Sequence, residues 1–199
     1  MTGGLTASAR AALSGWHAPD AEQDALRHTY LAFVDAAGNP CERACVPGHL
    51  TASAAVFDAT GTRVLLTLHP RVGKWVQLGG HCEPGDPSLA AAALREATEE
   101  SGLDGLVLSP GPVHLHTHPI TCSLGVPTRH LDVRYAAVAP ATADGTPPVP
   151  QISEESVDLA WWPVDDLPAQ VDTESVPAVI AHGLTALRAA GLLPEPATR

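Results

Sequence analysis

Residues 79–103 have the sequence GGHCEPGDPSLAAAALREATEESGL, and this stretch decides the fold. It follows a short apolar segment, residues 75–78, and opens with two glycines and a polar loop. Asp86 is a favourable N-cap and Pro87 suits the first helical position. The following residues are rich in helix formers until Gly102 offers a C-terminal stop. We therefore expect a strand that ends at the two glycines, a loop, and a long helix that starts at Asp86.

Three glutamates of the predicted helix share one face. Glu96, Glu99 and Glu100 stand at positions i, i+3 and i+4, directly after Arg95. Like charges at this spacing destabilise a helix by ~0.2–0.5 kcal/mol per pair, so the face needs either full solvation or a cation. A solvated face is the usual outcome on an arbitrary helix. The Gly-Gly turn and the carboxylate-bearing loop favour a cation here, because Mg2+ takes oxygen ligands and glycine lets the backbone approach a ligand closely.

Residues 80–103 resemble the Nudix box, whose pattern is Gly, five residues, Glu, seven residues, then Arg-Glu-apolar-any-Glu-Glu-any-Gly-apolar. The second half of the pattern is matched by Arg95, Glu96, Ala97, Glu99, Glu100, Gly102 and Leu103. The first half departs from it. Counting from Gly80, the five-residue gap ends on Asp86 instead of Glu, and eight residues instead of seven precede Arg95. The extra residue falls where a loop meets a helix, so the glutamate face is unaffected. Asp86 then acts mainly as a helix cap, with Glu83 as a substitute for the first Glu of the family pattern.

The resemblance implies a fold and a set of roles. The fold is an α/β protein, a Nudix-type α/β/α sandwich with a mixed β-sheet. Glu96, Glu99 and Glu100 would bind Mg2+ or Mn2+ with help from a Gly79 or Gly80 carbonyl. Arg95 would hold a carboxylate in place by a charge-assisted hydrogen bond.

Further roles follow from the same resemblance. Glu96 is the first candidate for the general base. The family often takes another acidic residue from a loop outside the box, and Glu154 or Glu155 fits that position, although an acidic loop is more often solvated surface.

The implied activity is hydrolysis of a phosphoanhydride bond. The substrate would be a nucleoside diphosphate derivative, such as ADP-ribose or another nucleotide-linked diphosphate, or a nucleoside triphosphate. A water molecule activated by metal and carboxylate would attack one phosphorus. Two alternatives stay open: a non-catalytic Nudix-fold nucleotide sensor, and a prenyl diphosphate isomerase, which would need Cys82 or Cys122 as an acid or base. The intact glutamate cluster favours catalysis over the sensor.

Outside this stretch the chain predicts a helical leader and one main domain. Residues 1–46 contain two short helices separated at Pro19, and they pack on or extend a Nudix domain of residues 47–199. Residues 49–58 and 63–70 predict a hairpin, because two apolar runs flank a tight turn. Later apolar runs predict strands at residues 106–108, 113–120, 131–138 and 157–162, and residues 177–190 predict a closing helix.

Histidines and arginines of the later strands are further candidates. His114, His116 and His118 alternate, so on a strand they face the same side, as a zinc site with Cys122 or as ordinary sheet-face or pocket histidines. His81 follows the two glycines and is either a phosphate contact or a simple loop histidine. Arg134 would contact a phosphate or lie on the surface.

Composition limits the partners and the location. The formal net charge is −11 and no run of basic residues occurs, so nucleic acid polymers are poor partners, whereas a small phosphorylated substrate is compatible with a bound metal. No apolar stretch approaches the ~20 residues that span a bilayer, and no signal-peptide pattern opens the sequence. We interpret the four cysteines as free thiols. These features predict a cytoplasmic protein without a membrane partner, and a homodimer is compatible with the leader.

Overall fold

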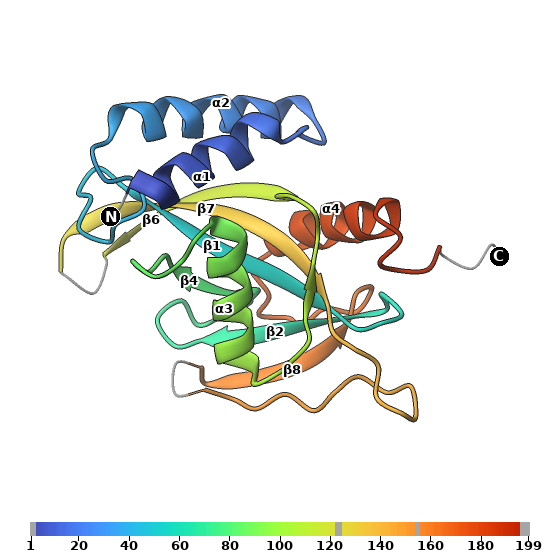
Figure 1. Cartoon of the computed structure of the whole chain (residues 1–199). Helices are drawn as coiled ribbons and strands as arrows, with labels where there is room; N and C mark the ends of the chain where they lie inside the picture. The colour runs from blue at the N-terminus through green and yellow to red at the C-terminus, as the bar shows by residue number, and fades with distance from the viewer. Residues whose placement is uncertain (1–2, 122–124, 154–155, 196–199) are drawn as a thin grey trace.

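The computed structural model describes residues 3–121, 125–153 and 156–195 (Figure 1). The helices are α1 (Gly3–Gly15), α2 (Ala21–Ala36), α3 (Leu89–Ser101) and α4 (Val176–Ala189). The strands are β1 (His49–Phe57), β2 (Arg63–His69), β3 (Lys74–Val76), β4 (Leu78–His81), β5 (Val107–Leu108), β6 (His114–Thr121), β7 (Pro127–Val138) and β8 (Asp158–Pro163). Within the described ranges, no helix is long and apolar enough to cross a membrane.

The strands form one mixed sheet around β1 and β7. These two strands run parallel, in register from His49 beside His130 to Phe57 beside Val138. All other pairings are antiparallel: β1 with β2 and β4, β2 with β3 and β8, and β7 with β5 and β6. The predicted hairpin is β1–β2. The later strands also occur, with β7 starting four residues before the predicted boundary.

Helices cover both faces of the sheet. Alternate residues of each strand point to opposite sides, so one strand contributes to two separate cores. Ala54 and Val56 of β1 lie in a core shared with α1, α2 and α3. Their neighbours Ala55 and Phe57 lie in a second core, which α4 covers. In Figure 1, α3 crosses the sheet near β4 and β2, while α1 and α2 form a pair beside β6 and β7. The architecture is the expected α/β/α sandwich with added N-terminal helices.

Helix α3 packs closely on the sheet because its buried face is made mostly of alanine. Leu89, Ala92, Ala93 and Ala97 are at most 1% exposed. The helix ends at Gly102, whose left-handed conformation (φ 64°) suits glycine, as predicted.

The predicted start of α3 is wrong by two residues. Ser88 is the N-cap, and its hydroxyl accepts a hydrogen bond of 3.1 Å from the Ala91 N–H. Asp86 does not cap the helix, because its carboxylate accepts hydrogen bonds from Arg95 instead. The residue that is extra relative to the family pattern is therefore absorbed in the loop, as expected, but the cap moves to Ser88.

The N-terminal helices are fastened to the sheet by buried polar contacts. Gln23 of α2 donates to the Leu115 carbonyl (3.1 Å) and accepts from the Leu115 N–H (2.6 Å), so it pairs with the backbone of β6. The Tyr30 hydroxyl donates to the His116 carbonyl at 2.7 Å. Ala9 and Leu13 of α1 are fully buried in the core that contains α3. The leader is thus packed on the sheet and not an appendage in solution.

Candidate active site

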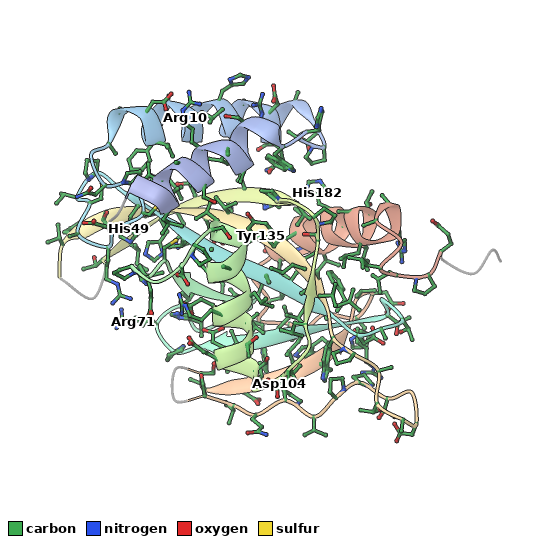
Figure 2. All side chains as sticks on the ribbon, in the orientation of Figure 1. Arg10, His49, Arg71, Asp104, Tyr135 and His182 are labelled. Atoms are coloured by element: carbon green, nitrogen blue, oxygen red, sulfur yellow. The ribbon has the colours of Figure 1, made fainter. Side chains whose placement is uncertain are left out.

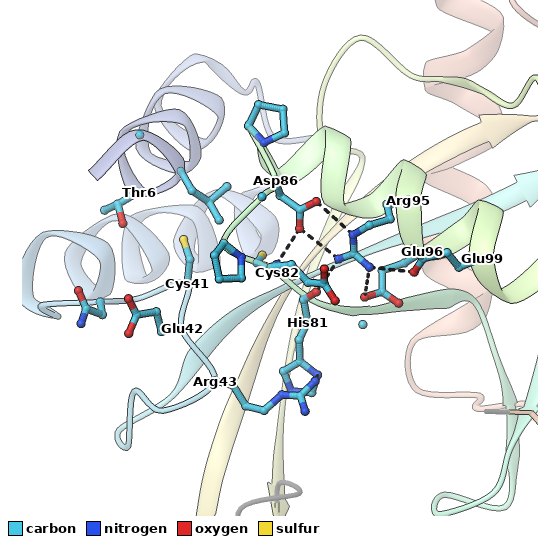
Figure 3. A pocket seen from close by; sticks show the side chains of 18 of the residues that line it. Thr6, Cys41, Glu42, Arg43, His81, Cys82, Asp86, Arg95, Glu96 and Glu99 are labelled. Atoms are coloured by element: carbon cyan, nitrogen blue, oxygen red, sulfur yellow. Dashed lines mark hydrogen bonds and ion pairs between the residues drawn. The ribbon is translucent and has the colours of Figure 1, made fainter. Parts of the chain in front are cut away.

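A cavity of about 1230 Å³ opens beside the end of β4, the loop that follows it and the C-terminal half of α3 (Figure 3). Four described parts of the chain line it: the start of α1, the segment that joins α2 to β1, the stretch from β4 through α3, and Ser153 before β8. Arg95, Glu96, Glu99 and Glu100 lie on its wall. The lining residues are Gly4 to Thr6, Asn39, Cys41 to Ala44, Gly80 to Pro87, Arg95, Glu96, Glu99, Glu100 and Ser153.

The two glycines of β4 permit a close approach of two other elements. Gly79 has φ 151°, and a Cβ there would overlap Ser53 of β1. A Cβ on Gly80 would lie 2.7 Å from Oε2 of Glu96. Larger residues at either position would push α3 or β1 away. The glycines therefore bring the glutamate face of α3 against the backbone of β4.

The three glutamates differ in burial along the shared face. Glu100 is 8% exposed, and its Oε2 accepts a hydrogen bond of 3.1 Å from the Gly79 N–H. The side chain of Glu96 is 12% exposed, whereas that of Glu99 is 61% exposed. The structure thus places all three on one cavity wall, with the carboxylates of Glu96 and Glu100 inside it and that of Glu99 at the rim, but their oxygens are spread along the wall and do not converge within 4.8 Å of one another.

Arg95 ties this wall together (Figure 3). Its Nη1 donates to Glu96 and to Glu99, each at 3.0 Å, and its Nη2 donates to the His81 carbonyl at 2.9 Å. The guanidinium also contacts both oxygens of Asp86 at 3.1 Å. The bond to Asp86 is the main reason that the pKa of Arg95 is raised above its usual value. Arg95 therefore fixes three carboxylates and one backbone carbonyl at once.

Asp86 occupies the position where the family pattern has its first Glu. Burial alone would raise its pKa, but the bonds from Arg95 and from the Glu83 N–H (2.7 Å) outweigh burial and lower it. Asp86 is thus an ionised partner of Arg95, only 8% exposed. The Glu83 side chain is a separate group that also lines the cavity.

His81 lies at the end of β4 and not in the following loop. It lines the cavity, and its Nδ1 lies 2.9 Å from Nη2 of Arg43. Because arginine only donates, Nδ1 accepts in this contact. Burial, followed by the charge of Arg43, lowers the pKa of His81 to about 3, so this imidazole is neutral near pH 7.

Among the described candidates, Arg134 does not lie on this wall. Arg134 is 3% exposed, donates to Asp132 at 2.8 Å, and does not line the cavity, so the surface interpretation is wrong for it. Glu154 and Glu155 lie outside the described residues, as does Cys122. Ser153, just before the two glutamates, does line the cavity.

The sequence analysis missed the part of the wall that precedes the main domain. Leu5, Thr6, Cys41 and Arg43 reach the cavity from α1 and from the segment after α2. No spacing in the sequence connects these residues to the glutamates. Their one signal is indirect: a leader with buried apolar positions has to pack against some part of the domain.

The donor set fits a hard divalent cation. The Glu96 carboxylate lies against Gly80 and that of Glu100 accepts from the Gly79 N–H, while Glu99 lines the same cavity at its rim. Among the described lining residues, the acidic ones outnumber Arg43 and Arg95. Carboxylate, carbonyl and water oxygens are the ligands that Mg2+ and Mn2+ prefer, so these residues fit either ion.

Comparison with known proteins identifies the family. The NUDIX domain model matches residues 47–181, about two thirds of the chain, so the protein belongs to the Nudix family. The predictions of the family, of the fold class and of a Nudix-type pyrophosphohydrolase as the enzyme class are confirmed.

Solved structures with a similar fold accompany this match. The dihydroneopterin triphosphate pyrophosphohydrolase of E. coli aligns with a TM-score of 0.52 at 17% identity, over 70% of this chain and 95% of that one. A NUDIX-family hydrolase from Clostridium perfringens has a TM-score of 0.48 at 26% identity, over 71% and 97%. The Ap4A hydrolase of C. elegans aligns with a TM-score of 0.48 at 20% identity, over 71% of this chain and 98% of that one.

Proposed function

We propose that this protein is a divalent-metal-dependent hydrolase that cleaves a phosphoanhydride bond in a small nucleotide. The substrate is a nucleoside diphosphate derivative, such as ADP-ribose, or a nucleoside triphosphate. One observation carries the proposal: Glu96, Glu99 and Glu100 line one large cavity, where Glu96 and Glu100 contact the glycines of β4. A cavity of about 1230 Å³ holds a nucleotide, since small-molecule sites commonly measure roughly 300–1,000 Å³.

The residues of this wall have distinct roles in the proposal. Glu96, Glu99, Glu100 and the Gly80 carbonyl hold Mg2+ or Mn2+, and Arg95 keeps the first two carboxylates in place. A bound divalent cation supplies charge neutralisation on the diphosphate and makes a water molecule more acidic. Glu96 takes the proton from the attacking water, because its carboxylate lies deep in the wall and is oriented by Arg95.

Arg43 and His81 provide the other side of the cavity. Arg43 lines the cavity and lies beside His81, with its Nη2 2.9 Å from Nδ1 of that ring. Its guanidinium suits a phosphate oxygen, and the neutral His81 beside it suits a phosphate or a ribose hydroxyl. Arg134 is too deeply buried to serve in this way.

Two weaker alternatives remain as outcomes of the test. A nucleotide sensor would bind the same ligands without turnover. An isomerase of prenyl diphosphates would need a reactive thiol, and Cys82 opposes it: burial raises its pKa far above the usual value, and its thiol donates to the Leu50 carbonyl.

We also infer the organisation of the chain from these contacts. Residues 1–46 form a leader that completes the cavity wall, and residues 47–199 form the Nudix domain. The described cysteines, Cys41, Cys45 and Cys82, are free thiols, which suits the proposed cytoplasmic location. A homodimer and the absence of nucleic acid polymers as partners stay predictions.

The test is release of phosphate or mononucleotide from a panel of ADP-ribose, NADH, diadenosine polyphosphates, sugar nucleotides and nucleoside triphosphates. Each is assayed with Mg2+, with Mn2+ and with a chelator. We expect metal-dependent release from at least one class and its loss in the double variant Glu99→Gln/Glu100→Gln. Thermal stabilisation by a nucleotide without release would favour the sensor, and activity that survives chelation would contradict the metal site.

A further inference from the structure

Histidines form a continuous row across the sheet, on the face opposite α3. Figure 2 labels two of its members, His49 at the start of β1 and His182 on α4. His114, His116 and His118 share one side of β6, as predicted, with ring centroids 6.5 and 5.6 Å apart. These three stack as a ladder and do not converge on one point. The row runs through His182, His114, His116, His118, His130, His49 and His81.

Three of these histidines do converge, at the end of the row nearest the cavity. His49, His81 and His130 each offer one ring nitrogen, and these atoms lie within 4.8 Å of one another. In the described part of the chain this is the one such group of metal-ligating side chains. Backbone register explains the convergence. His49 is paired with His130 across β1 and β7, and His81 is paired with Thr51, two residues along β1 on the same face.

The buried member of this cluster lacks hydrogen-bond partners. His49 is fully buried, and its contact with the Cys45 backbone falls outside good hydrogen-bonding geometry, so both ring nitrogens are unsatisfied. Nε2 of His130 is likewise buried and unsatisfied. A buried polar atom without a partner destabilises the fold, and such atoms are uncommon in proteins. A ligand that accepts the lone pair of one nitrogen from each ring would remove part of this cost.

We propose that His49, His81 and His130 form a second metal site, which binds a borderline transition-metal dication such as Zn2+. Imidazole nitrogens suit Zn2+, Co2+, Ni2+ and Cu2+, whereas Mg2+ prefers the oxygens of the glutamate cluster. The two sites therefore select different ions, although they share the segment Gly80–His81. Three protein nitrogens leave the fourth position of a tetrahedral ion to a water molecule or to His118, whose ring lies 5.2 Å from that of His130.

The site closes by a small movement of the side chains. Zn–N bonds of about 2.0–2.1 Å place the nitrogens of a tetrahedral site roughly 3.3 Å apart, so the present spacing must shrink. His81 and His130 are only partly buried, so their rings can rotate toward the fixed His49. Arg43 opposes the closure, because it donates to Nδ1 of His81 and places a positive charge beside the site. Metal binding thus requires Arg43 to turn away.

The experiment measures Zn2+ on the full chain while Mg2+ occupies the glutamates. Chelator-treated protein is dialysed against Zn2+ in a large excess of Mg2+, and the bound zinc is measured per chain. Co2+ titration, followed by the visible absorption of tetrahedral Co2+, gives the affinity. We expect one tightly held ion. The variants His81→Gln and His130→Gln should each weaken it by at least roughly tenfold, since even outer-shell changes at metal sites cost that much.

Two variants serve as controls. His28→Gln removes an exposed histidine of α2, and Glu99→Gln alters the other metal site. Both should retain zinc and cobalt as the unmodified chain does. Circular dichroism checks the fold of each variant, and His49 is left intact because it is fully buried. Zinc affinity unchanged in both His81→Gln and His130→Gln, or lost only in Glu99→Gln, would overturn the proposal.

Discussion

The glutamate wall and the histidine cluster meet at residues 80–81, yet they are held in opposite ways. In the wall, one guanidinium bonds to Asp86, Glu96 and Glu99 within 3.1 Å. In the cluster, neutral imidazoles pack ring against ring, with centroids 4.9–5.1 Å apart. Carboxylates repel one another and need a positive charge between them to stay close, whereas neutral imidazoles do not. The glutamate wall is therefore held ready for a hard cation, whereas the histidine cluster closes only when an ion binds.

The largest expected effect is a loss of kcat when Glu96 of the glutamate wall is replaced. Glu96→Gln keeps the shape of the side chain and an oxygen for Arg95, but it removes the proposed base. We expect kcat to fall by roughly 10²–10⁴-fold, the usual contribution of general acid–base catalysis. Asp104→Asn, an exposed carboxylate just beyond α3, is the control and should keep full activity. A kcat unaffected by Glu96→Gln would remove this residue from the mechanism.

The next effect concerns stability on the histidine side. Asp132 lies under the row of histidines, and its oxygens accept from Arg134, Ser53 and Thr51 at 2.8, 2.8 and 3.1 Å. Asp132→Ala leaves Arg134 buried without its partner, so the free energy of unfolding should fall by about 3–5 kcal/mol in urea titrations. The exposed pair Arg10–Asp35 is the matched control, because Asp35→Ala should cost at most about 1 kcal/mol. Equal losses would show that burial of the Asp132 pair contributes nothing.

The two regions also differ in how far the sequence reveals them. Glu96, Glu99 and Glu100 belong to one helix, and helical periodicity alone places them on one face. The same holds for His114, His116 and His118 on one strand. Contacts within a single element follow from its repeat, so this much of the site and most elements of the fold could be predicted.

Contacts between elements could not be predicted in this way. The meeting of His49 and His130 depends on the parallel pairing of β1 with β7, which no local pattern specifies. The role of Asp86 depends on the path of a loop, because the same side chain can cap a helix or bind Arg95 nine residues later. The strong N-cap preference of Asp predicts that Asp86 caps the helix. In the structure Asp86 binds the guanidinium of Arg95 instead, and the hydroxyl of Ser88 caps the helix.

A smaller effect is expected on zinc affinity when Arg43, which lies between the two regions, is replaced. Arg43→Gln removes the donor that occupies Nδ1 of His81 and a positive charge beside the proposed zinc site. Zinc affinity should rise by at least roughly tenfold, because a unit charge ~4 Å from a dication repels it by about 2 kcal/mol even in water. Cobalt titration measures the change. Arg63→Gln, a charge at the start of β2, is the control. A weaker affinity in Arg43→Gln would mean that Arg43 supports the site instead of opposing it.

The smallest effect is a change in pH dependence caused by His114. Burial, followed by the charges of Arg134 and His182, lowers the pKa of His114 from 6.5 to about 3, against the opposing charge of Asp132. Between these values the unfolded chain binds a proton that the folded chain does not, so acidification from about pH 6.5 toward 3 destabilises the fold. His116 stacks on the same ring, and burial lowers its pKa to about 4, so it adds to the loss over a narrower range.

Replacing His114 with Gln keeps a polar side chain but removes one of these protonation sites. The free energy of unfolding should then decrease less steeply as the pH falls from about 6.5 to about 3, while its value near pH 7 changes little. Urea titrations at a series of pH values measure the slope. His28→Gln is the matched control, since it removes an exposed imidazole from α2. If both variants reduce the pH dependence of the free energy of unfolding equally, the burial of His114 is not the cause of the acid sensitivity. The other histidines of the row would then have to account for it.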